Sequence, residues 1–216
     1  MAQTRLIVLA TRNKGKFEEI KALLVGLPVQ VQSLADFPHL DEPAETGATF
    51  AANAAAKALY YARATGRWCL ADDSGLEVDA LGRAPGVRSA RYAADRCPPG
   101  ADRQTIDRAN NARLLEELKD VPPQRRTARF VCHLALADSE RILIETFDTV
   151  EGLIADSPRG ENGFGYDPLF FIPSLGCTTA QLTGQRKNEL SHRGKAVRHL
   201  VSLLGSFVAS TDSHPR

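Results

Sequence analysis

Residues 127–154 read TARFVCHLALADSERILIETFDTVEGLI, and this stretch decides the class of fold. Two segments rich in β-branched and aromatic residues, Thr127–Ala137 and Arg141–Ile154, flank the polar triplet Asp138-Ser139-Glu140. The pattern predicts a β-hairpin with two long arms. Because the strands of a hairpin pair antiparallel, a sheet that contains this one cannot be purely parallel.

Outside the hairpin, short apolar runs alternate with segments of helical spacing. The apolar runs predict strands at Arg5–Ala10, Val29–Ser33, Trp68–Ala71, Leu76–Val78 and Leu169–Ile172. The helical spacing predicts helices at Lys14–Val25, Gly47–Ala64 with Thr46 as N-cap, Asp102–Leu118 and Ser191–Ser210. Asp72–Gly75 has the composition of a turn, and 82–100 and 158–168 that of loops.

These elements predict an α/β protein with a mixed β-sheet and flanking helices. Neither an internal repeat nor a linker divides the 216 residues, so we expect a single domain over 1–216 with the last six residues frayed.

Composition excludes several classes of protein. Hydrophobic residues make up 43% and charged residues 25%, as in ordinary globular domains, which argues against a disordered chain. Lys and Arg total 27 against 26 Asp and Glu, so the net charge of +1 gives no general attraction to nucleic acids or anionic membranes. No apolar run approaches the roughly 20 residues that a membrane span needs.

The four cysteines, Cys69, Cys97, Cys132 and Cys177, are widely spaced and form no CxxC pair. This spacing argues against a structural zinc site. Free thiols fit a reducing compartment, so we expect a cytoplasmic protein.

The hexapeptide Thr11-Arg12-Asn13-Lys14-Gly15-Lys16 lies where a predicted strand ends and a helix begins. The first N–H groups of a helix are unpaired and favour anions, and Lys16 adds a positive charge. The segment is not a Walker A loop, because the leading Gly is missing and Phe17 replaces the Ser or Thr that would hold magnesium. It is equally explained as a helix cap followed by surface lysines.

Carboxylates that could hold Mg²⁺ occur in two places, at Asp72-Asp73 and at Glu45. Adjacent side chains of an extended segment point to opposite sides, so Asp72 and Asp73 need not act together. An ordinary turn and a helix-dipole contact explain the same residues without a ligand. Asn53 and Lys57, four residues apart, share one face of an alanine-rich helix and could line the same site.

A third set of residues is suited to a purine base. In Gly163-Phe164-Gly165-Tyr166-Asp167-Pro168, two glycines permit close approach of the backbone and Phe164 offers a ring for stacking. Lys187 and the cluster Ser191-His192-Arg193-Gly194-Lys195 follow, the latter where basic residues oppose the helix dipole. Together with the carboxylates of Glu45, Asp72 and Asp73 and with residues 11–16, here called the phosphate loop, these residues predict a Mg²⁺–nucleoside triphosphate pocket.

The sequence resembles the inosine triphosphate pyrophosphatases, a Ham1-like family that acts on non-standard purine nucleoside triphosphates. The stretches that carry the resemblance follow the order of the family and span nearly the whole chain: TRNKGK (11–16), ETGATFAANAAAKA (45–58), ADDSGLEVDAL (71–81), APGVRSARYA (84–93), GFGYDPLF (163–170) and LSHRGKA (190–196).

The resemblance implies Mg²⁺-dependent hydrolysis of ITP, dITP or XTP to the monophosphate and pyrophosphate, by attack of water on the α-phosphorus. It implies an elongated α/β fold with two lobes around a nucleotide cleft, and a homodimer. Carried over by position, Asp73 is the catalytic acid, Glu45 and Asp73 face Mg²⁺, and Thr11, Arg12, Asn13, Lys14, Gly15 and Lys16 hold the phosphates. The remaining nucleotide-binding positions are Ser74, Phe164, Gly165, Tyr166, Asp167, Lys187, His192 and Arg193.

In one place the sequence departs from the family, which has an acid before the Asn of its long helix where this chain has Ala52. The sequence leaves open whether Asp73 is a metal ligand, a general base or both. Donors aimed at a 6-oxo group would reject ATP, but GTP shares that group and its rejection is not explained.

Three alternatives remain. The Maf-like nucleotide pyrophosphatases share the general fold, but their N-terminal loop is rich in Ser and Arg, unlike TRNKGK. A nucleotide sensor without turnover would bind ITP and leave it intact. A nucleic-acid-binding protein would require strong, salt-dependent DNA binding, which the balanced charge disfavours.

Overall fold

The computed structural model describes residues 5–212, with side chains up to residue 205. Its strands are β1 (Arg5–Leu9), β2 (Val29–Ser33), β3 (Trp68–Val78), β4 (Thr127–Ala137), β5 (Ile142–Ile154), β6 (Phe170–Ile172) and β7 (Cys177–Thr178). Its helices are α1 (Lys14–Leu23), α2 (Phe50–Thr65), α3 (Arg103–Glu117), α4 (Gly184–Leu190) and α5 (His192–Asp212).

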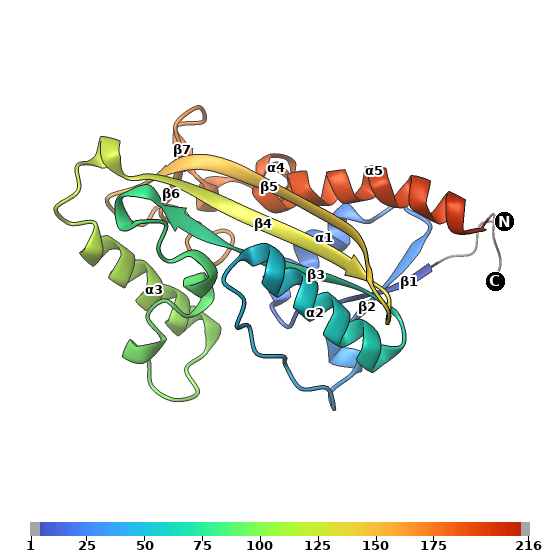
Figure 1. Cartoon of the computed structure of the whole chain (residues 1–216). Helices are drawn as coiled ribbons and strands as arrows, with labels where there is room; N and C mark the ends of the chain where they lie inside the picture. The colour runs from blue at the N-terminus through green and yellow to red at the C-terminus, as the bar shows by residue number, and fades with distance from the viewer. Residues whose placement is uncertain (1–4, 213–216) are drawn as a thin grey trace. The chain divides into compact units, whose positions relative to one another are not determined.

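The seven strands form one mixed sheet in the order β2-β1-β3-β4-β5-β6-β7. β1 pairs parallel with β2 and β3, whereas β6 pairs antiparallel with β5 and β7. β4 and β5 are neighbours, and the N–H of Asp138 donates to the carbonyl of Arg141 in the turn that joins them (3.1 Å). The predicted hairpin and the mixed α/β sheet are therefore confirmed (Figure 1).

Two local predictions were wrong, and one helix was missed. Asp72–Gly75 is not a turn, because β3 continues unbroken from Trp68 to Val78. α2 begins at Phe50 instead of Gly47, and its N-cap is Thr49, whose side chain accepts from the N–H of Ala52. The interval 158–191 contains a short helix, α4, that no sequence pattern indicated. Of the expected fraying in the last six residues, 213–216 lie outside the described residues, and 211–212 belong to α5.

The chain divides into two compact units. Unit 1 consists of Met1–Asp73, Cys132–Asp148 and His192–Arg216, and unit 2 of Ser74–Val131 and Thr149–Ser191. β3, β4 and β5 each contribute residues to both units. A single functional domain over 1–216 stays a prediction.

The core of unit 1 follows from the alternation of side chains along its strands. Ile7 and Leu9 of β1 pack on one face, together with residues of α1 and α5, whereas Val8 points to the other face. That second face is lined by small side chains and receives α2 through Ala54 and Ala58 (Figure 1). Small residues on both partners allow close approach of helix and sheet. The face consists of Val8, Ala10, Cys69, Ala71, Ala135 and Ala137.

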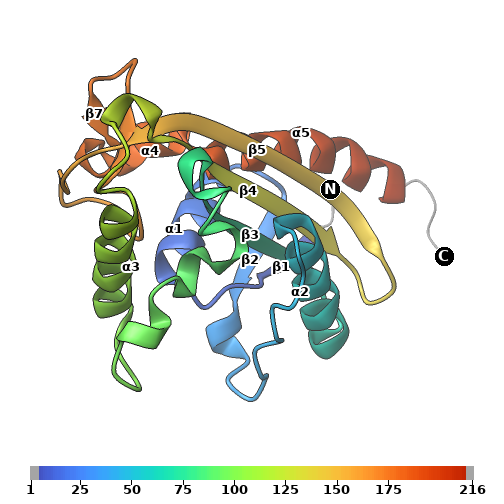
Figure 2. The same cartoon turned by 60° about the vertical axis from the view of Figure 1, so that its left-hand side comes forward.

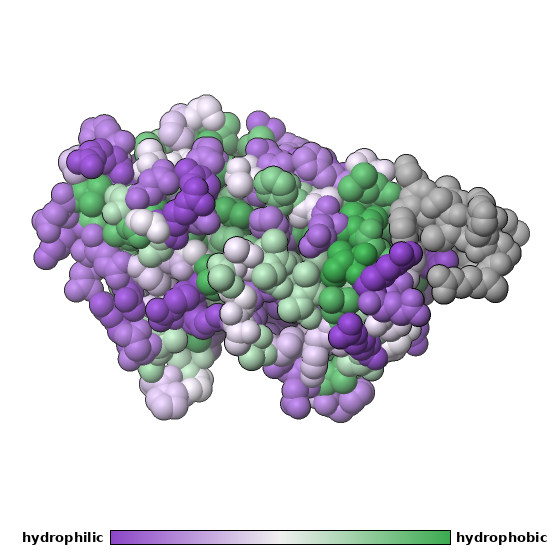
Figure 3. Space-filling view, in the orientation of Figure 1, coloured by the Kyte–Doolittle hydropathy of each residue, from purple (hydrophilic) through white to green (hydrophobic). Residues whose placement is uncertain are grey.

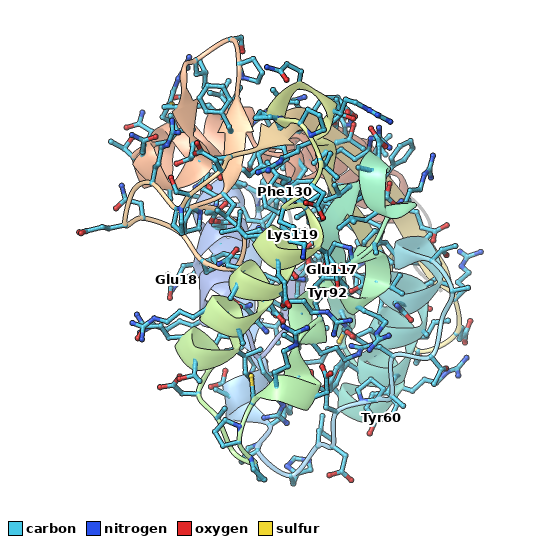
Figure 4. All side chains as sticks on the ribbon, turned by 90° about the vertical axis from the view of Figure 1, so that its left-hand side faces the viewer. Glu18, Tyr60, Tyr92, Glu117, Lys119 and Phe130 are labelled. Carbon is cyan, nitrogen blue, oxygen red and sulfur yellow. The ribbon has the colours of Figure 1, made fainter. Side chains whose placement is uncertain are left out.

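Unit 2 has a separate core beneath α3. Leu114 and Leu118, at the end of this helix, are buried with Leu76, Phe130 and Phe170. The Tyr92 hydroxyl donates to Glu117 of α3, and the two side chains lie next to one another in Figure 4. None of the helices in residues 5–212 is long and apolar enough to cross a membrane.

Candidate active site

The loop between β1 and α1 has the geometry of an anion site. The Asn13 side chain accepts from the N–H of Lys16 (3.2 Å), and Thr11 Oγ1 accepts from the N–H of Asn13 (3.1 Å). These bonds fix the start of α1, whose N-terminal N–H groups carry partial positive charge. A cavity of about 290 Å³ adjoins this helix start, and its lining is Thr11, Arg12, Asn13, Lys14, Phe17, Ser33 and Ala35.

β3 directs its two adjacent carboxylates to opposite sides, as an extended strand must. The side chain of Asp72 is 0% exposed and receives charged donors from both sides. Lys16 Nζ donates to its Oδ1, and Arg193 Nε donates to its Oδ2 (2.8 Å). Cys132 Sγ also donates to Oδ2 (3.2 Å). Asp72 therefore ties the phosphate loop to the first turn of α5.

Charge explains why a fully buried carboxylate is tolerated at this position. Burial alone would raise the pKa of Asp72, but Arg193 and Lys16 hold that pKa well below its usual range. Arg193 also donates to Glu19 of α1, so its own positive charge is balanced. Burial and the neighbouring Asp72 together raise the pKa of the Cys132 thiol well above its ordinary value, which keeps it a neutral donor.

Asp73 lies on the other side of β3 in a different electrostatic setting. Burial raises its pKa to about 6, Lys16 and Lys57 act to lower it, and Glu45 acts to raise it. Lys57 Nζ pairs with Glu45 Oε1 at 2.5 Å and is 3.4 Å from the carbonyl oxygen of Asp72. Burial acts to lower the pKa of Lys57, but Glu45 and the two aspartates outweigh it and raise that pKa. Two acids and one lysine thus meet on this side of β3.

The segment that carries Glu45 is locked to α2. Asn53 Oδ1 accepts from the N–H of Gly47 at 2.8 Å. A Cβ on Gly47 would lie 2.5 Å from the same oxygen, so only glycine allows this approach. Asn53 and Lys57 lie one helical turn apart on α2. Asn53 therefore holds the loop at Gly47, and Lys57 holds the Glu45 carboxylate.

The residues around Asp73 fit a divalent cation. Asp73 Oδ2 is buried and finds no hydrogen-bond partner within the described part of the chain, although it belongs to a carboxylate. Residues 5–212 contain no group of three or more His, Cys, Asp or Glu side chains arranged around one ion. Mg²⁺ does not require one, because it keeps several waters and takes one or two carboxylates plus the phosphates of its substrate. Glu45 and Asp73 meet that requirement.

Unit 2 contains the residues predicted to bind the base. Lys187 Nζ donates to Asp167 Oδ2 (2.6 Å) and lies 4.7 Å from the centroid of the Phe164 ring. Asp167 Oδ2 also accepts from the N–H of Phe164 (2.8 Å), and Asp167 Oδ1 accepts from Thr179 Oγ1 (2.8 Å). The buried Asp167 thereby holds both the ring and the ammonium group in place. Gly163 is required beside it, because a Cβ there would lie 2.1 Å from Asp167 Oδ2.

The structure distributes the predicted site residues over the two units. In unit 1 it brings together Lys16, Asp73 and Glu45, with Arg193 on the opposite side of β3. His192, at the start of α5, is 5% exposed. In unit 2 it brings together Phe164, Gly165, Tyr166, Asp167 and Lys187, and Ser74 is the first residue of that unit, half-buried on β3.

Sequence reasoning missed several residues that shape the two sets. Glu19 could have been found, because it stands three residues after Lys16 on the same helix. Thr179, Asp107 and Asn111 carry no local signal for their contacts with the Gly163–Asp167 loop. The sequence pattern predicts Cys132 as a core residue of a strand, and only the structure shows that its thiol donates to Asp72.

Comparison with known proteins identifies the family of this chain. The model of the Ham1 family matches residues 7–203. The dITP/XTP pyrophosphatase of Geobacter sulfurreducens is 50% identical over 202 residues, which cover 94% of this chain and 97% of that protein. The dITP/XTP pyrophosphatase of Geobacillus kaustophilus is 50% identical over 194 residues, 90% of this chain and 91% of the relative.

Solved structures show the same fold. A HAM1 protein from Coxiella burnetii superposes with a TM-score of 0.81 at 40% identity, covering 94% of this chain and 99% of that one. The Ham1 protein of Staphylococcus aureus gives a TM-score of 0.79 at 38% identity, with the same coverage. With a family match across most of its length, near-full-length relatives and a shared fold, this chain belongs to the Ham1 family.

Proposed function

We propose that this chain hydrolyses the non-standard purine nucleoside triphosphates ITP, dITP and XTP to the monophosphate and pyrophosphate, and so removes them from the nucleotide pool. The observation that carries the proposal is the pair of carboxylates on β3, with Asp72 anchoring Lys16 on one side and Asp73 facing Glu45 and Lys57 on the other. The relatives named dITP/XTP pyrophosphatase support the same substrate class.

Mg²⁺ is the proposed cofactor, held by Glu45 and Asp73. When bound, it would supply positive charge against the triphosphate oxygens and polarise the reacting phosphorus. Asp73 Oδ2, which is buried without a hydrogen-bond partner among the described residues, supports a cation at this place.

The chain's own groups divide the remaining work. The start of α1 and Lys16 bind and orient the phosphates, which is the main task in phosphoryl transfer. The Asp73 carboxylate positions the water that attacks the α-phosphorus and accepts its proton, and burial, which raises the pKa of Asp73 to about 6 in the metal-free chain, favours its action as a base. Asp72, fully ionised and engaged by Arg193, holds Lys16 in place and takes no proton.

Unit 2 provides the preference for the base. The Lys187 ammonium, one of whose N–H groups donates to Asp167, is the group that we assign to the 6-oxo group of the base. An adenine presents a 6-amino group, itself a donor, and would place a donor against the donors of that ammonium. Phe164 offers the purine a surface on which to stack.

The test measures pyrophosphate release from ITP, XTP, dITP, GTP and ATP, with and without Mg²⁺. We expect fast Mg²⁺-dependent release from ITP and XTP, little from ATP, and loss of at least about 100-fold in Asp73→Asn. Asp120→Asn, the same change at an exposed loop position, is the matched control and should keep full activity.

Two outcomes would contradict the proposal. Release of orthophosphate in place of pyrophosphate would move the attack to another phosphorus. Tight binding of ITP without turnover would identify the protein as a nucleotide sensor.

We further propose a cytoplasmic homodimer. Free thiols at all four cysteines support a reducing compartment. A hydrophobic patch lies on one face, over the region of the β4–β5 hairpin (Figures 1 and 3). On this hairpin Phe147 is 61% exposed and stacks on His133, which supports burial against a second copy. Sedimentation equilibrium should give twice the 23.5 kDa chain mass.

A further inference from the structure

α3 holds the loop that carries Phe164 by two hydrogen bonds to a single residue. Asp107 Oδ2 accepts from the N–H of Gly165 (2.9 Å), and Asn111 Nδ2 donates to the carbonyl of the same glycine (2.9 Å). Asp107 and Asn111 are four residues apart and share one face of the helix. Figure 2 shows α3 standing beside the loop that precedes β6.

These bonds fix the direction of the aromatic side chain. The N–H of Gly165 belongs to the peptide plane that follows Phe164, and Asp107 holds that plane. The N–H of Phe164 belongs to the plane before it, and Asp167 holds that one at 2.8 Å. Because both planes flanking Phe164 are bonded to carboxylates, the φ and ψ angles of this residue are set, and with them the direction of its Cα–Cβ bond.

Features of the two α3 residues argue against a merely structural contact. Asp107 is buried, and Arg103 of the same helix neutralises it at 2.9 Å. The buried Asn111 Oδ1 finds no hydrogen-bond partner among the described residues, although its Nδ2 is bonded. Leucine at both positions would dock α3 on its apolar core without these polar costs. The polar side chains of Asp107 and Asn111 are therefore explained by the hydrogen bonds that they make to Gly165.

We propose that Asp107 and Asn111 are positioning residues that hold the Phe164 ring as the platform for the purine, and thereby set the affinity for the base. The inference rests on the proposed function of this chain. It assigns to α3 an effect on binding of the base and none on the chemistry at the α-phosphorus.

The test is a double-mutant cycle between α3 and the ring. Phe164→Ala should raise KM and Kd for ITP by about 5- to 150-fold, the range that loss of one base–aromatic stack produces. Asp107→Leu should raise both constants at least 5-fold, Asn111→Leu should act in the same direction, and kcat should stay within 2-fold. In the Phe164→Ala background Asp107→Leu should have no further effect, because it acts through the ring.

Conservative and matched variants sharpen the result. Asp107→Asn keeps an acceptor for the Gly165 N–H and should restore most of the affinity. Gln104→Leu replaces an exposed amide on the same helix and should change nothing. Inorganic tripolyphosphate has no base, so its inhibition constant should be the same in wild type and in all α3 variants.

The proposal is overturned if the effects of Asp107→Leu and Phe164→Ala multiply, if tripolyphosphate inhibition weakens in parallel with ITP binding, or if kcat falls while KM is unchanged. Circular dichroism checks that each variant folds. If Asp107→Leu does not fold, Asn111→Leu, at a half-buried position, replaces it in the double-mutant cycle. Failure of the proposed function is distinct, because wild type would then release no pyrophosphate. In that case, the Kd for ITP, measured by calorimetry for wild type and the α3 variants, would still test whether α3 affects binding of the base.

Discussion

At the scale of single residues, one peptide bond separates two carboxylates with opposite properties. Asp72 is held ionised by Lys16 and Arg193, whereas burial raises the pKa of Asp73 to about 6. The first contributes stability at neutral pH, and the second reduces it. Each consequence can be measured.

Asp73→Asn should stabilise the metal-free protein at pH 7 while it abolishes turnover. The folded-state pKa of about 6 exceeds the ordinary aspartate value of 3.8, so the folded carboxylate carries a penalty that is absent below pH 4 and complete above pH 6. Removing the charge should add about 1–3 kcal/mol to the free energy of unfolding at pH 7. Urea denaturation at pH 7 and pH 4 measures the difference, which should shrink at pH 4. A difference that does not depend on pH would contradict this account.

Arg193→Met should destabilise the protein by about 3–5 kcal/mol, because it leaves the buried Asp72 without its main partner. The pKa of Asp72 is depressed, so in wild type its contribution is present above the unfolded pKa and is lost only as the pH falls through the folded value. Arg96→Met, which breaks an exposed pair with Glu116, is the control and should cost about 0–1 kcal/mol. Equal effects of the two changes in urea denaturation would refute the assigned role of Arg193.

At the scale of elements, α2 depends on small residues. Ala58 is fully buried against the alanine-lined face of the sheet in unit 1. Ala58→Leu should therefore overpack this contact and cost about 1–3 kcal/mol. Ala56→Leu makes the same substitution at an exposed position of the same helix and should be nearly neutral. Thermal unfolding of the two variants compares them directly, and a neutral Ala58→Leu would show that helix and sheet are not in close contact.

The same scale shows how far the sequence could predict the fold. Hydrophobic periodicity located the hairpin, the four long helices and most strands, because each carries enough apolar residues to define a buried face. It failed at Asp72–Gly75, where Asp, Ser and Gly favour a turn in isolation but neighbouring strands hold an extended conformation. Gly75 serves there to admit Ser89, whose Oγ would lie 2.3 Å from a Cβ at that position.

Helix boundaries and long-range partners were beyond local rules. Thr46 and Thr49 are equally good N-caps by residue type. Thr49 is used because Asn53 Oδ1 already bonds the N–H of Gly47 and holds the preceding loop outside the helix. Which residues assemble on β3 could be inferred from the family, but not that Arg193, 121 positions away, would neutralise Asp72.

At the scale of the whole molecule, the two units have separate cores, yet β3, β4 and β5 belong to both. Their shared strands predict one cooperative unfolding transition. The single tryptophan, Trp68, lies in unit 1 and reports on that unit alone. Leu114→Ala, in the core of unit 2, should cost about 2–5 kcal/mol and lower the Tm by about 4–20 °C.

The measurement compares Trp68 fluorescence with far-ultraviolet circular dichroism in Leu114→Ala. Both transitions should move together, although the substitution lies in the other unit. If the fluorescence transition stays at its wild-type temperature while the dichroism transition moves, the units unfold independently.

The opposite orientation of Asp72 and Asp73 also limits which insertions and deletions this sequence can accept during evolution. Substitutions within β3 alter one side chain, but a one-residue insertion or deletion between Trp68 and Asp72 would exchange the two faces of everything that follows. The anchoring acid would then face Glu45 and the reactive acid would face Arg193. Length variation should therefore be tolerated in the loops on either side of β3 and excluded from the first half of the strand.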